Sequence, residues 1–196
     1  MQPRDVAVPL AGRAVRLDPT SLADAPGVLV AADHDEVFRW SSAARPRDAQ
    51  EARQHVERLL AAPGIEPWTV RSVRDGTVLG LTCAYDIDPA SRALAIGYTW
   101  LSRGVWGRGV NTEAKRLQLG HAFETLACVR VVWHVDALNT RSRRAVEALG
   151  ASLEGVLRKH KQRRDGSWRD TALYAMTDEE WPGAGARLDA RLPPVG

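Results

Sequence analysis

The spacing of hydrophobic residues changes its period several times along the chain, which predicts alternating helices and strands. A short strand is expected around residues 15–17, and a capping signal at residues 20–24 predicts a first helix after it. Pro46 is expected to open a second helix, in which apolar residues recur at helical spacing up to residue 60. Two helices are therefore expected before the main sheet.

From residue 68 the pattern acquires strand character. Residues 68–73 and 78–86 are expected to form a hairpin around the turn Asp75-Gly76. A third strand, at residues 93–101, is rich in β-branched and aromatic side chains and leads into a loop with three glycines.

Helix and strand patterns continue to alternate after this loop. Asn111 is expected to cap the next helix, and a strongly apolar strand follows at residues 129–135. A short helix begins near residue 140 and is stopped by Gly150, and the closing hairpin turns at residues 165–166. The order predicts an α/β fold, a mixed sheet with helices on both faces.

Length and composition predict one domain. The chain has 196 residues, 44% of them hydrophobic, which is enough for one sizeable core. We expect the domain at residues 1–181 and a loosely ordered Pro/Gly/Ala-rich tail at 182–196. The apolar runs are too short to cross a bilayer and the N-terminus lacks a signal-peptide core, so a cytoplasmic protein without membrane contact is expected. The net charge of +3 permits an anionic ligand without requiring one.

The cysteines and histidines give no sign of a metal. Cys83 and Cys128 are the only cysteines, and their apolar surroundings predict free buried thiols. The five histidines are scattered without ligand spacing, so no metal is expected.

The loop after the third strand carries the most informative pattern. Gly104, Gly107 and Gly109 allow the backbone to approach a phosphate closely, and the helix behind them offers unpaired N–H groups beside a partial positive charge. The spacing is not that of a P-loop, because Gly-Lys-Ser/Thr is absent and Lys115 comes too late in the helix. The loop also does not follow a first strand, as it would in a dinucleotide fold. A tight turn without a ligand remains the alternative.

Two segments carry a resemblance to a known family. IGYTWLSRGVWGRGVNTEAKRLQLGHAFE and VDALNTRSRRAVEALGASLEGVLRKH resemble the GNAT superfamily of N-acyltransferases, and its RimJ/RimL-like branch in particular. The likeness runs from about residue 12 to 181 and includes the RDGSWRDTALYAM hairpin and the DEEWP ending. It implies a mixed, mostly antiparallel sheet splayed into a V, with acetyl-CoA in the cleft as cosubstrate. The implied reaction is direct attack of an amine on the acetyl-CoA thioester.

The resemblance also implies which residues hold the cofactor. The pantetheine arm would pair with the third strand, whose backbone bulge would point an N–H at the thioester carbonyl, and the pyrophosphate would lie on the 103–112 loop. The implied contacts are Tyr98, Thr99, Trp100, Leu101, Trp106, Gly107, Arg108, Gly109, Val110, Asn111, Thr112 and Asn139. The family loop usually begins with Gln or Arg where this chain has Gly104, which removes a side-chain contact. Strand packing is the alternative for the side chains of Tyr98 and Trp100.

Ser142 is the candidate acid for the departing thiolate. Asn139-Thr-Arg-Ser142 matches the family's Asn-x-x-Ser, and helical spacing places Ser142 on the same inward face as Val146 and Leu149. A plain helix-capping role is the alternative for Ser142 and for Asn139.

The sequence names no general base. Family members often carry Glu where this chain has Ala95. His134 lies on an apolar strand and Glu154 matches a family Glu-Gly position, but ordinary structural roles suit both, and a water chain could serve instead. The sequence also does not identify the acceptor amine, which could belong to a small molecule or to a peptide N-terminus. It does not decide whether the protein forms a homodimer. Other readings are an acyl-CoA-binding module with little activity, or a ribosome- or RNA-associated protein through the basic run at residues 158–164, although nucleic acid is not favoured.

Overall fold

The computed structural model describes residues 6–192. The strands are β1 (Leu10–Ala11), β2 (Val15–Pro19), β3 (Glu66–Ser72), β4 (Val78–Asp88), β5 (Ala93–Leu101), β6 (Arg130–Asp136), β7 (Ser152–Gln162) and β8 (Trp168–Thr177). The α-helices are α1 (Ala25–Ala31), α2 (Ala49–Ala61), α3 (Val110–Gly120), α4 (Thr140–Glu147) and α5 (Trp181–Arg191). Short 3-10 turns lie at Leu22–Asp24, Asp35–Phe38 and Arg103–Val105, and a π-helical turn at His121–Thr125 extends α3.

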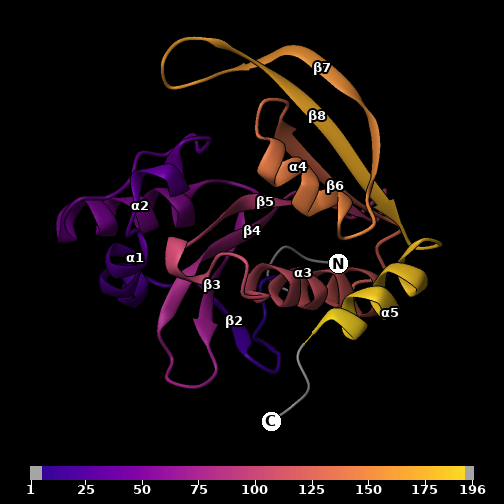
Figure 1. Cartoon of the computed structure of the whole chain (residues 1–196), viewed down its shortest axis with the longest axis horizontal. Coiled ribbons are helices and arrows are strands. Elements are labelled where there is room, and N and C mark those ends of the chain that lie inside the picture. Colours follow the sequence, from indigo (N-terminus) through magenta and orange to yellow (C-terminus); the bar gives the residue numbers. More distant parts are fainter. Residues whose placement is uncertain (1–5, 193–196) are drawn as a thin grey trace.

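The described strands form one sheet in the order β1-β2-β3-β4-β5-β6-β8-β7. Every neighbouring pair is antiparallel except β5 and β6, which run parallel. These two strands pair only from Ala93 opposite Arg130 to Ala95 opposite Val132, and their remaining lengths are not paired. The sheet therefore opens between β5 and β6, and the mixed, splayed sheet expected from the sequence is confirmed (Figure 1).

Helices cover both faces of this sheet. Leu119 of α3, Val146 of α4 and Leu188 of α5 are buried in the larger core with side chains of β2 to β6 and β8. On the other face, Val28 of α1 and Val56 of α2 form a second core with side chains of β4 and β5. The two cores therefore lie on opposite faces of the sheet, one under α1 and α2 and the other under α3, α4 and α5.

Two predicted helix starts are wrong. Helix α2 begins at Ala49 because Asp48 caps it by accepting the Glu51 N–H at 2.8 Å, so Pro46 lies before the helix and not in its first turn. Helix α3 is preceded by Gly109, whose left-handed backbone (φ 82°) takes the N-cap position assigned to Asn111. Glycine adopts that backbone without strain, so the helix is capped two residues earlier than predicted.

The expectation of a loosely ordered tail is also wrong for residues 182–191, which belong to helix α5. Proline is tolerated in its first turn, and the helix buries Trp181, Ala184 and Leu188 in the larger core. The Trp181 ring stacks on Phe123 with centroids 5.5 Å apart. Helix α5 is therefore part of the domain, and residues 193–196 lie outside the described part of the chain.

Candidate functional site

Strand β5 contains a bulge where the sheet opens. Between the pairs Cys83–Gly97 and Leu81–Trp100, β4 contributes one residue, Thr82, and β5 contributes two. One of these two is Tyr98, a non-glycine residue with a φ of 51°. Such a backbone costs energy and is often found next to functional sites. The third strand thus contains a bulge, as the resemblance implied, and it begins three residues beyond Ala95, the last residue of β5 that pairs with β6.

The glycine-rich loop joins this strand to the N-terminus of α3. Gly107 and Gly109 both have positive φ, of 74° and 82°, and a Cβ at either position would meet no atom within 4 Å. The open space means that packing does not require a glycine there, and the positive φ values give the backbone the shape of an anion-binding nest. Ser102 anchors the start of the loop by donating to Asp33 at 2.6 Å. The loop and the start of α3 thus have the backbone shape that an anion site requires, and the binding of a phosphate there stays a prediction.

The predicted cofactor residues of β5 and the loop differ in what their side chains do. Trp100 is buried and packs against Phe38, with ring centroids 5.0 Å apart, and Leu101 is buried in the larger core. Both can meet a ligand only through the backbone. Trp106 donates from its indole N–H to the Leu101 carbonyl at 2.9 Å. Tyr98 is 45% exposed, so its side chain is accessible beside the opening.

Arg141 joins the loop to helix α4 and was not predicted from the sequence. Its guanidinium lies 3.5 Å from the centroid of the Trp106 ring, a close cation–π contact. The two residues come from α4 and from the glycine-rich loop, which are separate in the sequence. No spacing rule links them, because the contact exists only once the sheet has opened between β5 and β6.

The start of α4 lies at the end of β6. Asn139 is its cap, and the Asn139 side-chain oxygen accepts the Ser142 N–H at 3.1 Å. The capping role considered for Ser142 therefore belongs to Asn139. The Ser142 hydroxyl is half-buried and has no hydrogen-bond partner among the described residues. Because Val146 of the same helix is buried in the core shared with α3, Ser142 lies on the α3 side of the opening.

The two candidate bases have different surroundings. Arg130 bonds both carboxylate oxygens of Glu154, one of them at 2.6 Å, and holds the pKa of that carboxyl below its usual range. Glu154 is thus tied into an ion pair at the far end of β6. His134 instead contacts Tyr85 of β4, with 2.9 Å between the imidazole Nδ1 and the hydroxyl oxygen. Burial lowers the pKa of His134, which favours a neutral imidazole.

Tyr85 lies on β4, opposite the Ala95 position where family members often carry Glu. It pairs with Ala95, and a Cβ on Gly97 would lie only 2.8 Å from the Tyr85 ring. The Tyr98 ring stands edge-on to the Tyr85 ring, with centroids 5.1 Å apart. Tyr85, Tyr98 and His134 therefore form one polar and aromatic cluster at the bulge, from three different strands. Tyr85 could not be predicted from the sequence, because its partner His134 lies 49 residues away.

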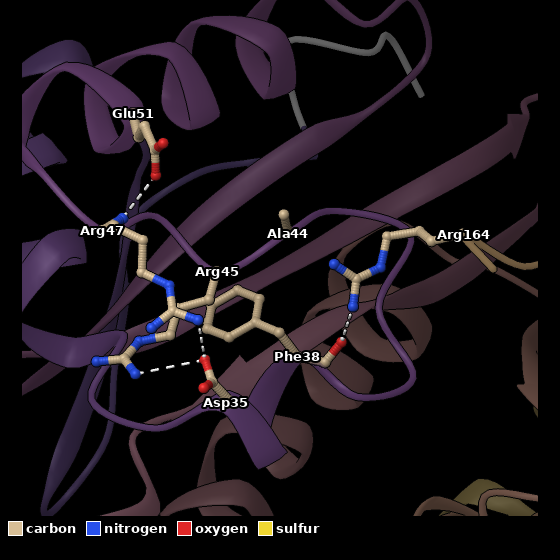
Figure 2. Close-up of a pocket in the computed structure, with 7 residues that line it drawn as sticks. All are labelled: Asp35, Phe38, Ala44, Arg45, Arg47, Glu51 and Arg164. Carbon is tan, nitrogen blue, oxygen red and sulfur yellow. Dashed lines mark hydrogen bonds and ion pairs between the residues drawn. The ribbon is translucent and has the colours of Figure 1, made fainter.

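A charged pocket of about 410 Å³ lies beside the helices α1 and α2. Figure 2 shows its lining, which consists of Asp35, Phe38, Ala44, Arg45, Arg47, Glu51 and Arg164. Arg45 and Arg47 both point at Asp35, at 3.4 and 2.7 Å. Arg164, from the turn between β7 and β8, donates to the Phe38 carbonyl at 3.0 Å and so connects the late hairpin with the early helices.

The last two arginines of the basic run at residues 158–164 bond other parts of the protein. Besides Arg164, Arg163 pairs with the buried Asp136 at the end of β6, at 2.7 and 3.0 Å. Both guanidiniums hold the hairpin against the rest of the molecule. These two charges of the run are therefore engaged within the protein, and they give the RNA interpretation no support.

Lys115 is the residue that sequence reasoning misjudged most. The sequence only showed that it comes too late in the helix for a P-loop. In the structure it is 4% exposed, on the face of α3 that packs under the bulge. Its amino group donates to Thr82, Thr99 and Gln118 at 2.7, 2.8 and 2.7 Å. A lysine without a carboxylate partner is rare in a protein interior.

The comparisons with known proteins agree with this geometry. The profile of the Acetyltransferase (GNAT) domain matches residues 14–152, so the chain belongs to the GNAT acetyltransferase family. A GCN5-related N-acetyltransferase from Brucella melitensis has 28% sequence identity and a TM-score of 0.91, over 96% of this chain and 86% of that chain. Mycobacterium smegmatis RimJ, solved in complex with CoA-disulfide, has 27% identity and a TM-score of 0.76, over 93% of this chain and 92% of that chain.

A curated relative supports the RimJ/RimL-like branch. The Bacillus subtilis protein named "Putative ribosomal N-acetyltransferase YdaF" is 31% identical over 109 residues, which are 56% of this chain and 58% of the relative. The alignment thus spans little more than half of that protein. No helix of the described residues has the length and apolar character that spanning a membrane requires.

Proposed function

We propose that the protein transfers an acetyl group from acetyl-CoA to an amine by direct attack on the thioester. The observation that carries the proposal is the opening between β5 and β6, with the bulge at Tyr98 on one side and the anion-binding loop at its mouth. An extended pantetheine arm fits beside a strand edge as an added strand would. The pyrophosphate then lies on the N–H groups of the loop and of the first turn of α3.

The cofactor would meet backbone more than side chains. The backbone groups of Tyr98 to Leu101 that point away from β4 would face the pantetheine arm. The N–H groups of Gly107 and of residues 109–112 would face the phosphates, whereas those of Trp106 and Arg108 bond the carbonyls of Arg103 and Val105. The side-chain oxygen of Asn139 is engaged in the cap, but its NH₂ group makes no hydrogen bond with the described residues and is available to a pantetheine carbonyl. Acetyl-CoA supplies the activated acyl group, and no step of the proposal requires a metal.

The acid and the base would act from opposite sides of the opening. His134 takes the proton of the attacking amine through Nε2, while Nδ1–H donates to the Tyr85 oxygen and fixes the tautomer. The amine nitrogen forms the new bond to the acetyl carbon, and the C–S bond breaks as the intermediate collapses. Ser142, on the α3 side, donates its proton to the leaving thiolate and regains one from water.

The charged pocket would receive the acceptor. Phe38 lines this pocket and also packs against Trp100 of β5, so the pocket and the opening share a wall. The amine would approach from the side of α1, α2 and the late hairpin. Its identity, whether a small molecule or a peptide N-terminus, is best found by screening a panel of amines and peptides for CoA release.

The same assay tests the reaction and its base. With an active acceptor, kcat/KM is expected to fall at acidic pH as His134 becomes protonated, with a midpoint below the ordinary histidine pKa because burial disfavours the cation. The charged and titratable groups around His134 are Tyr85, Asp86, Tyr98, His160, Lys161 and Arg169. His134→Gln should lower kcat/KM by ~10²-fold and abolish that acidic limb. If no amine releases CoA, the proposed reaction is wrong. An unchanged limb in His134→Gln would refute the base alone.

A further inference from the structure

The amino group of Lys115 is the centre of a hydrogen-bond network that spans the bulge. It bonds the hydroxyls of Thr82 on β4 and Thr99 on β5, and these two hydroxyls lie 2.8 Å from each other. Thr99 also donates to the Gly97 carbonyl at 3.3 Å. Since Gly97 and Thr99 flank Tyr98, the network holds the chain on both sides of the residue with positive φ.

The bulge needs such support. Its extra residue interrupts the ladder between Leu81 and Cys83, so the backbone there has fewer strand hydrogen bonds to fix its direction. The left-handed conformation of Tyr98 is costly for a side chain of its size and persists only where the surroundings enforce it. Lys115 reaches the bulge from the helix that begins with the anion-binding loop, so one helix contacts both parts of the proposed cofactor site.

We propose that Lys115 is a positioning residue, which through Thr82 and Thr99 holds the bulge of β5 in the geometry that presents a backbone N–H to the thioester carbonyl. This inference rests on the proposed acetyl transfer. The oxygen of that carbonyl gains negative charge in the transition state, and a donor stabilises it only when aimed at where the charge develops. Lys115 itself does not touch the substrate.

If Lys115 had only a structural role, its replacement would have a different effect on activity. Burial lowers the pKa of Lys115 to about 7, because the charged amine is less stable in the protein interior than in water. Lys115→Met removes the cost of burying a charge, which offsets the loss of the three hydrogen bonds to Thr82, Thr99 and Gln118. If Lys115 served only to fill the core, Lys115→Met should therefore leave activity intact. The proposal instead predicts a stable protein with a damaged chemical step.

The experiment compares Lys115→Met and Thr82→Val with the wild type and with Thr69→Val. Thr69 is a matched control because it is a fully buried threonine of the neighbouring strand β3, and it bonds Thr20 and Asp24 away from the bulge. We measure CoA affinity by calorimetry, kcat with a saturating amine found in the panel, and amide hydrogen exchange of the β5 segment.

The expected result is a fall in kcat of about tenfold or more for Lys115→Met, less than the full value of an oxyanion donor because the bulge is loosened and not removed. CoA affinity should change by less than about threefold, and exchange in β5 should accelerate. Thr82→Val should show the same changes at smaller size, and it decides the matter if Lys115→Met does not fold. Thr69→Val should keep the wild-type kcat. Wild-type kcat and exchange in the two bulge variants would overturn the inference, whereas a wild-type protein without transferase activity would refute the proposed function instead.

Discussion

The replacement of Lys115 by methionine should change how stability depends on pH. The amine has an ordinary pKa of 10.5, and burial lowers it to about 7 in the folded protein. Between these two values the unfolded chain holds a proton that the folded chain has released. The free energy of unfolding of the wild type should therefore rise with pH across this window, as far as Lys115 is concerned.

The size of the effect follows from the shift in pKa. A difference between 10.5 and about 7, at roughly 1.4 kcal/mol for each pKa unit, gives a ceiling of about 5 kcal/mol. Lys115→Met removes this contribution but also deprives Thr82, Thr99 and Gln118 of a donor, which costs roughly 1–3 kcal/mol. At pH 6 the variant should be at least as stable as the wild type. Its relative stability should then decline steadily toward pH 10.

Urea unfolding at several pH values from 6 to 10 measures this difference directly. Other groups, such as the buried Cys83 thiol with its raised pKa, titrate in both proteins and largely cancel in the comparison. Thr69→Val is the control, because it removes a buried uncharged hydroxyl that bonds Thr20 and Asp24 instead of Lys115, and it should keep the pH slope of the wild type. If the free energy of unfolding changed with pH equally in the wild type and in Lys115→Met, burial would not lower the pKa of Lys115, and the prediction would be refuted.

Three further predictions concern the proposed cleft. Gly109→Asp should lower CoA affinity at least tenfold by placing a negative charge beside the pyrophosphate, whereas Gly166→Asp, at a turn glycine with the same φ of 82° and equally open space, should keep it; calorimetry compares the two. Ser142→Ala should reduce kcat by ~10²-fold or less with an unchanged melting temperature, because Asn139 provides the cap, and a lower melting temperature with full turnover would refute the acid role. Arg164→Ala should raise KM for the acceptor severalfold with little change in CoA affinity, since it connects the hairpin to the acceptor-side pocket; unchanged acceptor kinetics would contradict that placement.

Most of the fold followed from the sequence because local patterns determine it. The strand at residues 93–101 and the hairpin turn at Gly166 were predicted at the right places, since hydrophobic period and turn chemistry are local signals. The starts of α2 and α3 were predicted a few residues away from where they lie. Pro46 and Asn111 each suit a helix start, but the structure caps the two helices with Asp48 and Gly109. Helix α5 was missed because its proline and glycines suggested a tail, while its burial against Phe123 depends on tertiary packing.

The site was predictable only where one segment carries it. The glycine-rich loop and the Asn139 cap are continuous in the sequence, so their geometry could be anticipated. The Tyr85–His134 pair and the Lys115 network join strands and helices that are far apart in the chain, and they depend on the bulge and on the opening of the sheet. Nothing in the spacing of these residues distinguishes them from ordinary core or sheet-face side chains.

The bulge at Tyr98 is the feature on which these parts converge. On the side of α1 and α2, Tyr98 itself contacts Tyr85, which holds His134. On the side of α3, Thr99 is bonded to Lys115. Tyr98 and Thr99, the two residues of the bulge, thus take part in separate networks on the two faces of the sheet. The strain of the left-handed Tyr98 and the buried amine of Lys115 both lower stability, and both lie at the step of β5 where we propose that a backbone donor faces the thioester. A fold selected for stability alone would have no reason to place both of these costs at the same step of one strand.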